Sequence, residues 1–102
     1  MDPELRVRIE NYIESLFVAP DDALSEGVAG AAAAGLPAIQ ISPNQGKLLY
    51  LLAKISGARR ILEIGTLGGY STTWLARALP PDGMVLTLEL DPRHAGVARS
   101  SV

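Results

Sequence analysis

The sequence contains no cysteine among its 102 residues, and this absence removes several kinds of site at once. Disulfide bonds, cysteine-based zinc sites and a cysteine nucleophile are all excluded. The chain also lacks an excess of positive charge, because its formal net charge is −2. Such a balance gives no electrostatic attraction to nucleic acid or to an anionic membrane. We therefore expect neither among its partners.

Long apolar runs are missing as well. The run AGAAAAG at residues 29–35 is far too short to span a bilayer. The first residues, MDPELRVRIENYIESL, are charged and amphipathic, and they lack the apolar segment of a secretory signal. We therefore expect a cytoplasmic protein. Apolar residues make up 48% of the chain and charged residues 20%, which is typical of one packed domain.

Helix-start signals predict three helices before residue 57. The first starts at Pro3, with Asp2 as its cap. The second is predicted over residues 23–34. The third begins with a capping box formed by Ser42 and Gln45. Its apolar face is broad, so we expect this helix to be well buried. That face consists of Leu48, Leu49, Leu51, Leu52 and Ile55.

A βαβα unit is predicted after these helices. Residues 60–64 and 84–90 are short, nearly continuous apolar runs, which is typical of parallel strands covered on both faces. Residues 70–79 between them predict a helix, and residues 80–83, PPDG, predict a turn. A further helix is expected from Pro92. The order is that of a Rossmann-like fold.

The loop after the first predicted strand is rich in glycine. Gly65, Gly68 and Gly69 let the backbone turn sharply and approach a ligand closely. The helix that follows presents free N–H groups, which favour an anionic group. Glu89 ends the second predicted strand, where nucleotide sites of this kind place an acid that accepts hydrogen bonds from ribose hydroxyls. The pattern predicts a pocket for an adenosine-type cofactor.

The loop departs from the dinucleotide fingerprint G-x-G-x-x-G, because Leu67 stands where a glycine would admit a pyrophosphate. Glu63 is an acid inside an apolar strand, which is unfavourable unless the acid is paired. We expect a ligand ammonium group or backbone N–H donors to pair it. S-adenosylmethionine, with an amino acid head and an adenosine tail, satisfies both ends of such a site.

Other interpretations stay open. The loop could be a tight turn only, within a non-catalytic oligomerising domain whose cofactor loop is vestigial. An NAD(P)-dependent dehydrogenase fragment is a further alternative, against which the missing fingerprint argues. His94 is the single histidine and has no evident partner in the sequence, so we expect it to be a surface residue.

The motif E-x-G-x-x-G-G-Y-S, followed by T-x-E-x-D-P and preceded by ISPNQGKLL, resembles S-adenosylmethionine-dependent O-methyltransferases of the catechol and caffeoyl-CoA type. The resemblance extends over roughly residues 41–99. It implies an α/β, Rossmann-like class I methyltransferase fold, here truncated to N-terminal helices plus the first βαβα. Residues 1–40 would be the helical segment, and residues 41–102 the first part of the cofactor-binding domain. The implied reaction is methyl transfer to a hydroxyl of a small, catechol-like acceptor.

The resemblance also implies a set of cofactor contacts. Glu63 and the loop backbone would line the methionine side of the cofactor. Ser71 would hydrogen-bond its carboxylate, and Glu89 its ribose. Ile41 would approach from the N-terminal side. The implied set is Ile41, Glu63, Gly65, Thr66, Leu67, Gly69, Ser71 and Glu89.

Members of this family run to about twice this length, within the range of a single domain. Their divalent metal, Mg²⁺, is held by Asp and Asn side chains from later strands, and a Lys near it is the implied base. We therefore expect no catalytic residue and no metal ligand in this chain, and no turnover by it alone. Two parallel strands leave open apolar edges, so we also expect a homo-oligomer.

Overall fold

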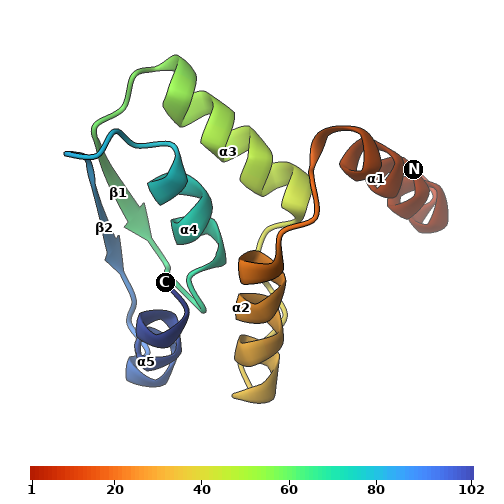
Figure 1. Cartoon of the computed structure of the whole chain (residues 1–102). Helices are drawn as coiled ribbons and strands as arrows, with labels where there is room; N and C mark the ends of the chain where they lie inside the picture. Colours follow the sequence, from red (N-terminus) through yellow and green to blue (C-terminus); the bar gives the residue numbers. More distant parts are fainter.

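The structure is a computed structural model that describes residues 1–102. Five helices and two strands follow one another along the chain (Figure 1). The elements are α1 (Pro3–Phe17), α2 (Asp22–Ala33), α3 (Pro43–Ile55), β1 (Arg60–Ile64), α4 (Tyr70–Arg77), β2 (Met84–Leu88) and α5 (Pro92–Ser101). The predicted βαβα unit is present, with three helices before it. None of the helices combines the length and the apolar character needed to cross a membrane.

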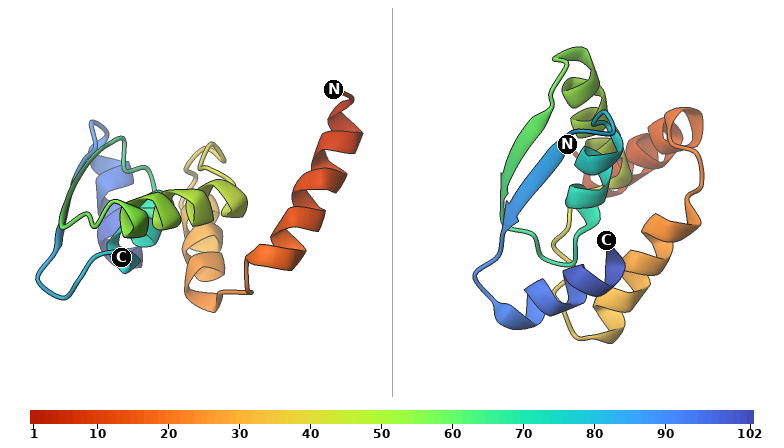
Figure 2. Two further views of the ribbon diagram at one scale, coloured as in Figure 1. Left: turned by 90° about the horizontal axis from the view of Figure 1, so that it is seen from above. Right: turned by 60° about the vertical axis from the view of Figure 1, so that its left-hand side comes forward.

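The two strands pair in parallel, with Glu63 opposite Thr87 in the register. All helices lie on one side of this sheet, and α1 stands farthest from the strands (Figures 1 and 2). The prediction that both sheet faces are covered is therefore wrong. Leu62 and Leu86 on the open face are 61% and 54% exposed, whereas alternate residues face the helices and are partly covered.

The capping box at the start of α3 is confirmed. The N–H of Gln45 donates to Ser42 Oγ at 3.2 Å, and the N–H of Ser42 donates to Gln45 Oε1 at 2.9 Å. The predicted deep burial of α3 is wrong, because only Gly46 and Ala53 are buried. Helix α3 packs on α4 along that narrow side. Leu49 is partly covered, and the other predicted face residues, such as Ile55 at 83% exposure, are exposed.

The other predicted boundaries are close to those observed. Asp2 caps α1 as predicted, and α2 begins one residue early, at Asp22. Helix α4 ends at Arg77 instead of residue 79, because the chain tightens into a final turn before Pro80. Strand β2 ends at Leu88, two residues early, so Glu89 lies just beyond the strand. The small core includes Leu24, Leu36, Trp74 and Ala98.

Candidate functional site

A pocket of about 380 Å³ lies where the loop between β1 and α4 meets the carboxyl end of β2. Six of the eight predicted site residues line it: Ile41, Gly65, Thr66, Leu67, Ser71 and Glu89. Ile39, Gln40, Gly68, Tyr70 and His94 complete its wall. Glu63 and Gly69 do not line this pocket. We call it the loop pocket.

The backbone of the loop explains its glycines. Gly65 has a φ of 94° and donates its N–H to Leu88 O at 2.7 Å, which extends the parallel ladder by one bond. Gly69 has a φ of 90° and precedes α4 without any side-chain cap. A Cβ at Gly69 would lie 2.5 Å from Val102 Cγ2. Both positions therefore require glycine, and the first N–H groups of α4 have no side chain bonded to them as a cap.

Leu67 adopts the same left-handed region, with a φ of 52°, and it is the only non-glycine residue that does so. Its N–H donates to Glu89 Oε1 at 2.7 Å. The N–H of Asp91 donates to the other oxygen, Oε2, at 3.0 Å. These two N–H donors, that of Asp91 first, hold the pKa of Glu89 below its usual value, and His94 adds a smaller lowering effect. Glu89 is thus an ionised carboxylate on the pocket wall, fixed from two sides.

His94 is not the surface residue that the sequence predicted. Its side chain is only 15% exposed, with Nδ1 3.8 Å from Glu89 Oε2 and Nε2 3.3 Å from Asp91 Oδ2. Both acids come from the turn that leads into α5, and Asp91 is the helix cap. The spacing of Asp91 and His94, three residues apart at a helix start, was the available signal.

Glu63 accepts hydrogen bonds from three side-chain hydroxyls. Ser71 Oγ donates to Glu63 Oε2 at 2.6 Å, and Thr87 Oγ1 donates to Glu63 Oε1 at 2.8 Å. Thr72 Oγ1 also donates to Oε1. Three hydroxyls therefore stabilise this partly buried acid. Thr72 and Thr87 were not among the predicted site residues, although the strand register places Thr87 directly opposite Glu63.

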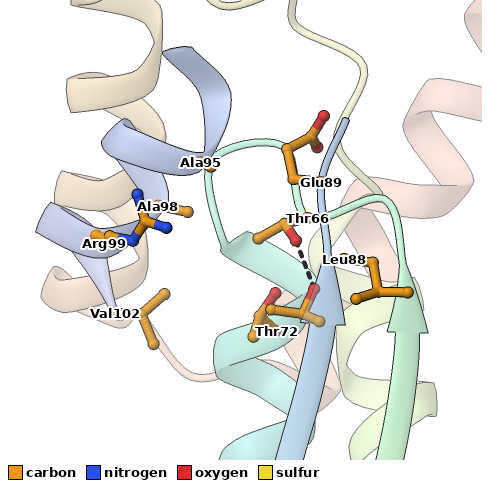
Figure 3. Close-up of a pocket in the computed structure, with 9 residues that line it drawn as sticks. Thr66, Thr72, Leu88, Glu89, Ala95, Ala98, Arg99 and Val102 are labelled. Atoms are coloured by element: carbon orange, nitrogen blue, oxygen red, sulfur yellow. Dashed lines mark hydrogen bonds between the residues drawn. The ribbon is translucent and has the colours of Figure 1, made fainter. Parts of the chain in front are cut away.

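Thr66 joins this group of hydroxyls to the loop. Its Oγ1 lies 2.5 Å from Thr87 Oγ1, and its side chain is buried (Figure 3). A second cavity, of about 510 Å³, lies on the α5 side of Thr66 and also touches Glu89. Figure 3 shows the Glu89 carboxylate turned away from Arg99 and Val102, which line that cavity. The Glu89 carboxylate thus lies on the side of the loop pocket and not on the side of the larger second cavity.

The spacing of the side chains also decides whether the chain could hold a metal ion. No three His, Asp or Glu side chains of the chain lie close enough together to hold a metal ion. The residues present therefore do not fit the divalent metal that the resemblance implies.

Comparison with known proteins places this geometry in a family. A family model described as O-methyltransferase matches residues 17–102. The catechol O-methyltransferase of Niastella koreensis is 50% identical over 102 residues, which cover 100% of this chain and 46% of that protein.

Two solved structures extend the likeness. An O-methyltransferase from Bacillus cereus, in complex with S-adenosylhomocysteine, has a TM-score of 0.90 and 52% identity, covering 92% of this chain and 43% of that one. The O-methyltransferase TomG from Streptomyces achromogenes, in complex with S-adenosylmethionine, has a TM-score of 0.91 and 48% identity, covering 99% and 45%.

The chain has part of the α/β, Rossmann-like fold of class I methyltransferases. The chain belongs to the O-methyltransferase family. The predicted resemblance is thereby confirmed, and nothing in these comparisons supports a dehydrogenase. The chain spans less than half the length of the relatives that it matches.

Proposed function

We propose that this chain binds S-adenosylmethionine as part of an O-methyltransferase whose acceptor is a hydroxyl of a small, catechol-like molecule. One observation carries the proposal: the loop pocket combines the Glu89 carboxylate with the uncapped N-terminus of α4. Residues 41–102 would supply the cofactor-binding part, and residues 1–40 the helical segment. We also propose that the protein acts in the cytoplasm, a location that cell fractionation can test.

The polar groups of the pocket suit the two ends of the cofactor. Glu89 uses one lone pair of each oxygen for backbone N–H groups, so further lone pairs are free to accept two ribose hydroxyls. The positive end of the α4 dipole, beside Tyr70 and Ser71, favours the methionine carboxylate. Ile41 supplies an apolar wall on the side that faces the α3 cap.

Glu63 has an indirect part in this proposal. Its carboxylate accepts a hydrogen bond from the Ser71 hydroxyl, which fixes the direction of the Ser71 side chain at the first turn of α4. The oxygen of Ser71 can still accept a hydrogen bond. Gly69 is the residue before the first turn of α4, and it does not line the loop pocket. Both residues therefore position the site in this proposal instead of lining it.

When bound, S-adenosylmethionine supplies an electrophilic methyl group on its sulfonium. The proposed work of this chain is to bind and orient that cofactor, so we assign no catalytic residue and expect cofactor binding without turnover. Clear methylation of a catechol by the purified chain, in the presence of Mg²⁺, would contradict this part of the proposal.

Calorimetric titration with S-adenosylhomocysteine tests the proposed function. We expect heat of binding from the native chain and a large loss of affinity in Glu89→Ala. Glu26→Ala is the matched control, because Glu26 is an exposed acid on α2 that lines no part of the loop pocket. Absence of binding by the native chain, at concentrations where it is folded by circular dichroism, would overturn the proposal.

A second candidate is an oligomerising domain, and the open sheet face favours it. The side chains of Leu62 and Leu86 are more than half exposed, and they are cross-strand neighbours. Apolar surface of this kind is usually covered by another molecule. Homo-oligomers without any cofactor binding would support this candidate over the first. Homo-oligomers that bind the cofactor would support the first candidate, because the second requires a loop that no longer binds it.

A further inference from the structure

We infer that His94 is a positioning residue for the proposed ribose site: its imidazole holds the Glu89 carboxylate in the orientation that faces the loop pocket. The inference rests on the proposed function, because it takes Glu89 as the group that receives the ribose hydroxyls. It adds a residue that the sequence pattern left outside the site.

The imidazole lies between two carboxylates. His94 Nδ1 is 3.8 Å from Glu89 Oε2, and His94 Nε2 is 3.3 Å from Asp91 Oδ2. The side chains of His94 and Glu89 are 15% and 13% exposed, so little water separates them from each other. His94 also lines the loop pocket itself. A side chain placed only to start α5 would not need to reach both acids.

The charges of Glu89 and Asp91 explain why an imidazole between them is favourable. Glu89 and Asp91 are two residues apart, and the negative charge of Asp91 raises the pKa of Glu89. That repulsion would push the Glu89 carboxylate away from Asp91 and out of its present orientation. His94 is the basic side chain that lowers the pKa of Glu89 and so opposes the effect of Asp91. The neighbouring Arg93 lowers the pKa of Asp91 but has no such effect on Glu89.

Three contacts therefore fix one carboxylate. The N–H groups of Leu67 and Asp91 hold its two oxygens, and the imidazole of His94 stands beside Oε2. A bidentate acceptor binds a diol best when its direction is set before the ligand arrives. The rest of the pocket wall has no charged side chain; Tyr70 is its other titratable group.

The test uses the full chain with two ligands, S-adenosylhomocysteine and its analogue without the ribose hydroxyls. Calorimetry of His94→Ala should show affinity for S-adenosylhomocysteine reduced roughly three- to fivefold, the upper part of the range for a charge pair that is partly exposed to solvent. The same substitution should leave the affinity for the analogue within about twofold, because the analogue makes no bond to Glu89. A general defect in folding would weaken both ligands alike.

Two further variants complete the test. His94→Gln keeps an N–H donor at this position, and we expect it to recover part of the lost affinity. Arg93→Ala removes a basic side chain from the same helical turn, and we expect native affinity from it. Equal binding by His94→Ala and the native chain, or an equal loss with both ligands, overturns the inference alone. Failure of the native chain to bind S-adenosylhomocysteine overturns the proposed function and this inference together.

Discussion

The carboxylate of Glu89 accepts a hydrogen bond from the N–H of Leu67 at 2.7 Å, which ties the end of β2 to the loop that follows β1. Leu67 occupies the left-handed region, with a φ of 52°, where a non-glycine residue is strained by about 1–2 kcal/mol. The bond to an ionised acceptor is strong enough to offset strain of this size. A ligand that engages Glu89 therefore also contacts the group that holds the loop in shape.

This geometry predicts how position 67 responds to substitution. Leu67→Asn should leave the free energy of unfolding nearly unchanged, because Asn tolerates a positive φ. Leu67→Val should lower it by roughly 1 kcal/mol, since a β-branched side chain is strained there. Urea unfolding followed by circular dichroism measures both. Equal stability of the two variants would contradict the assigned backbone conformation.

The hydroxyl cluster around Glu63 predicts a second effect. Thr87→Val keeps the shape of the side chain but removes the hydroxyl that donates to Glu63 and contacts Thr66. We expect a loss of about 1–3 kcal/mol in the free energy of unfolding, because the partly buried Glu63 carboxylate loses one of its hydrogen-bond donors. Thr87→Ser is the control, because it retains the hydroxyl. If both variants unfold at the same urea concentration, the hydroxyl has no special role.

The βαβα order, the helix caps and the glycine loop could be predicted because they depend on local signals. The capping box of Ser42 and Gln45 formed as expected, and Gly65 and Gly69 have the positive φ that makes glycine necessary. The partners of Glu63 and the place of His94 were missed. Both depend on side chains brought together across the strand register or across a turn, which periodicity does not encode.

The burial of α3 and of one face of the sheet was predicted wrongly, and both errors have the same physical cause. An apolar strand or helix face indicates that some partner should cover it, but does not indicate that the same chain supplies the partner. The broad face of α3 and the outer face of β1 and β2 were predicted to be buried. In the structure, Leu48 is 54% exposed and Ile64 is 82% exposed.

Contact between α3 and α4 predicts a sharp difference between two glycines. A Cβ at Gly46 would lie 2.3 Å from Trp74 Cδ1 and Nε1, inside the buried seam between these helices. Gly46→Ala should therefore lower the free energy of unfolding by about 1–3 kcal/mol through overpacking. Gly30→Ala on α2 meets nothing within 4 Å and should raise it by about 0.5–1 kcal/mol. Thermal melts of the two variants that shift in the same direction would contradict this packing.

The link between α2 and α4 predicts a pH effect. Hydrogen bonding from Arg77, followed by the N–H of Leu24, lowers the pKa of Asp21 below its ordinary value of 3.8. A lowered pKa in the folded state means that the stabilisation is present above pH 3.8 and is lost as the pH falls below it. Asp21→Asn keeps a good helix cap but removes the charge. We expect this variant to be less stable at neutral pH and to lose less stability on acidification.

Acid unfolding followed by circular dichroism measures that slope. Asp22→Asn is the matched control, because it removes the same charge from the next residue without touching Arg77. An Asp21→Asn variant with the same acid-unfolding slope as the native chain would show that the ion pair does not contribute.

The open face of the sheet leads to the last prediction. Leu62 and Leu86 lie side by side in the strand register and are 61% and 54% exposed. We expect the chain to self-associate through this face, because burying both leucines is favourable by about 25 cal/mol per Å² of apolar surface. Replacing both with Lys should shift the mass in light scattering toward that of the monomer. Leu16→Lys is the control, because Leu16 is 57% exposed and belongs to α1, the helix that stands farthest from the strands (Figure 1). Dissociation by Leu16→Lys alone would place the interface on α1, and a monomeric native chain would mean that these leucines are tolerated in water.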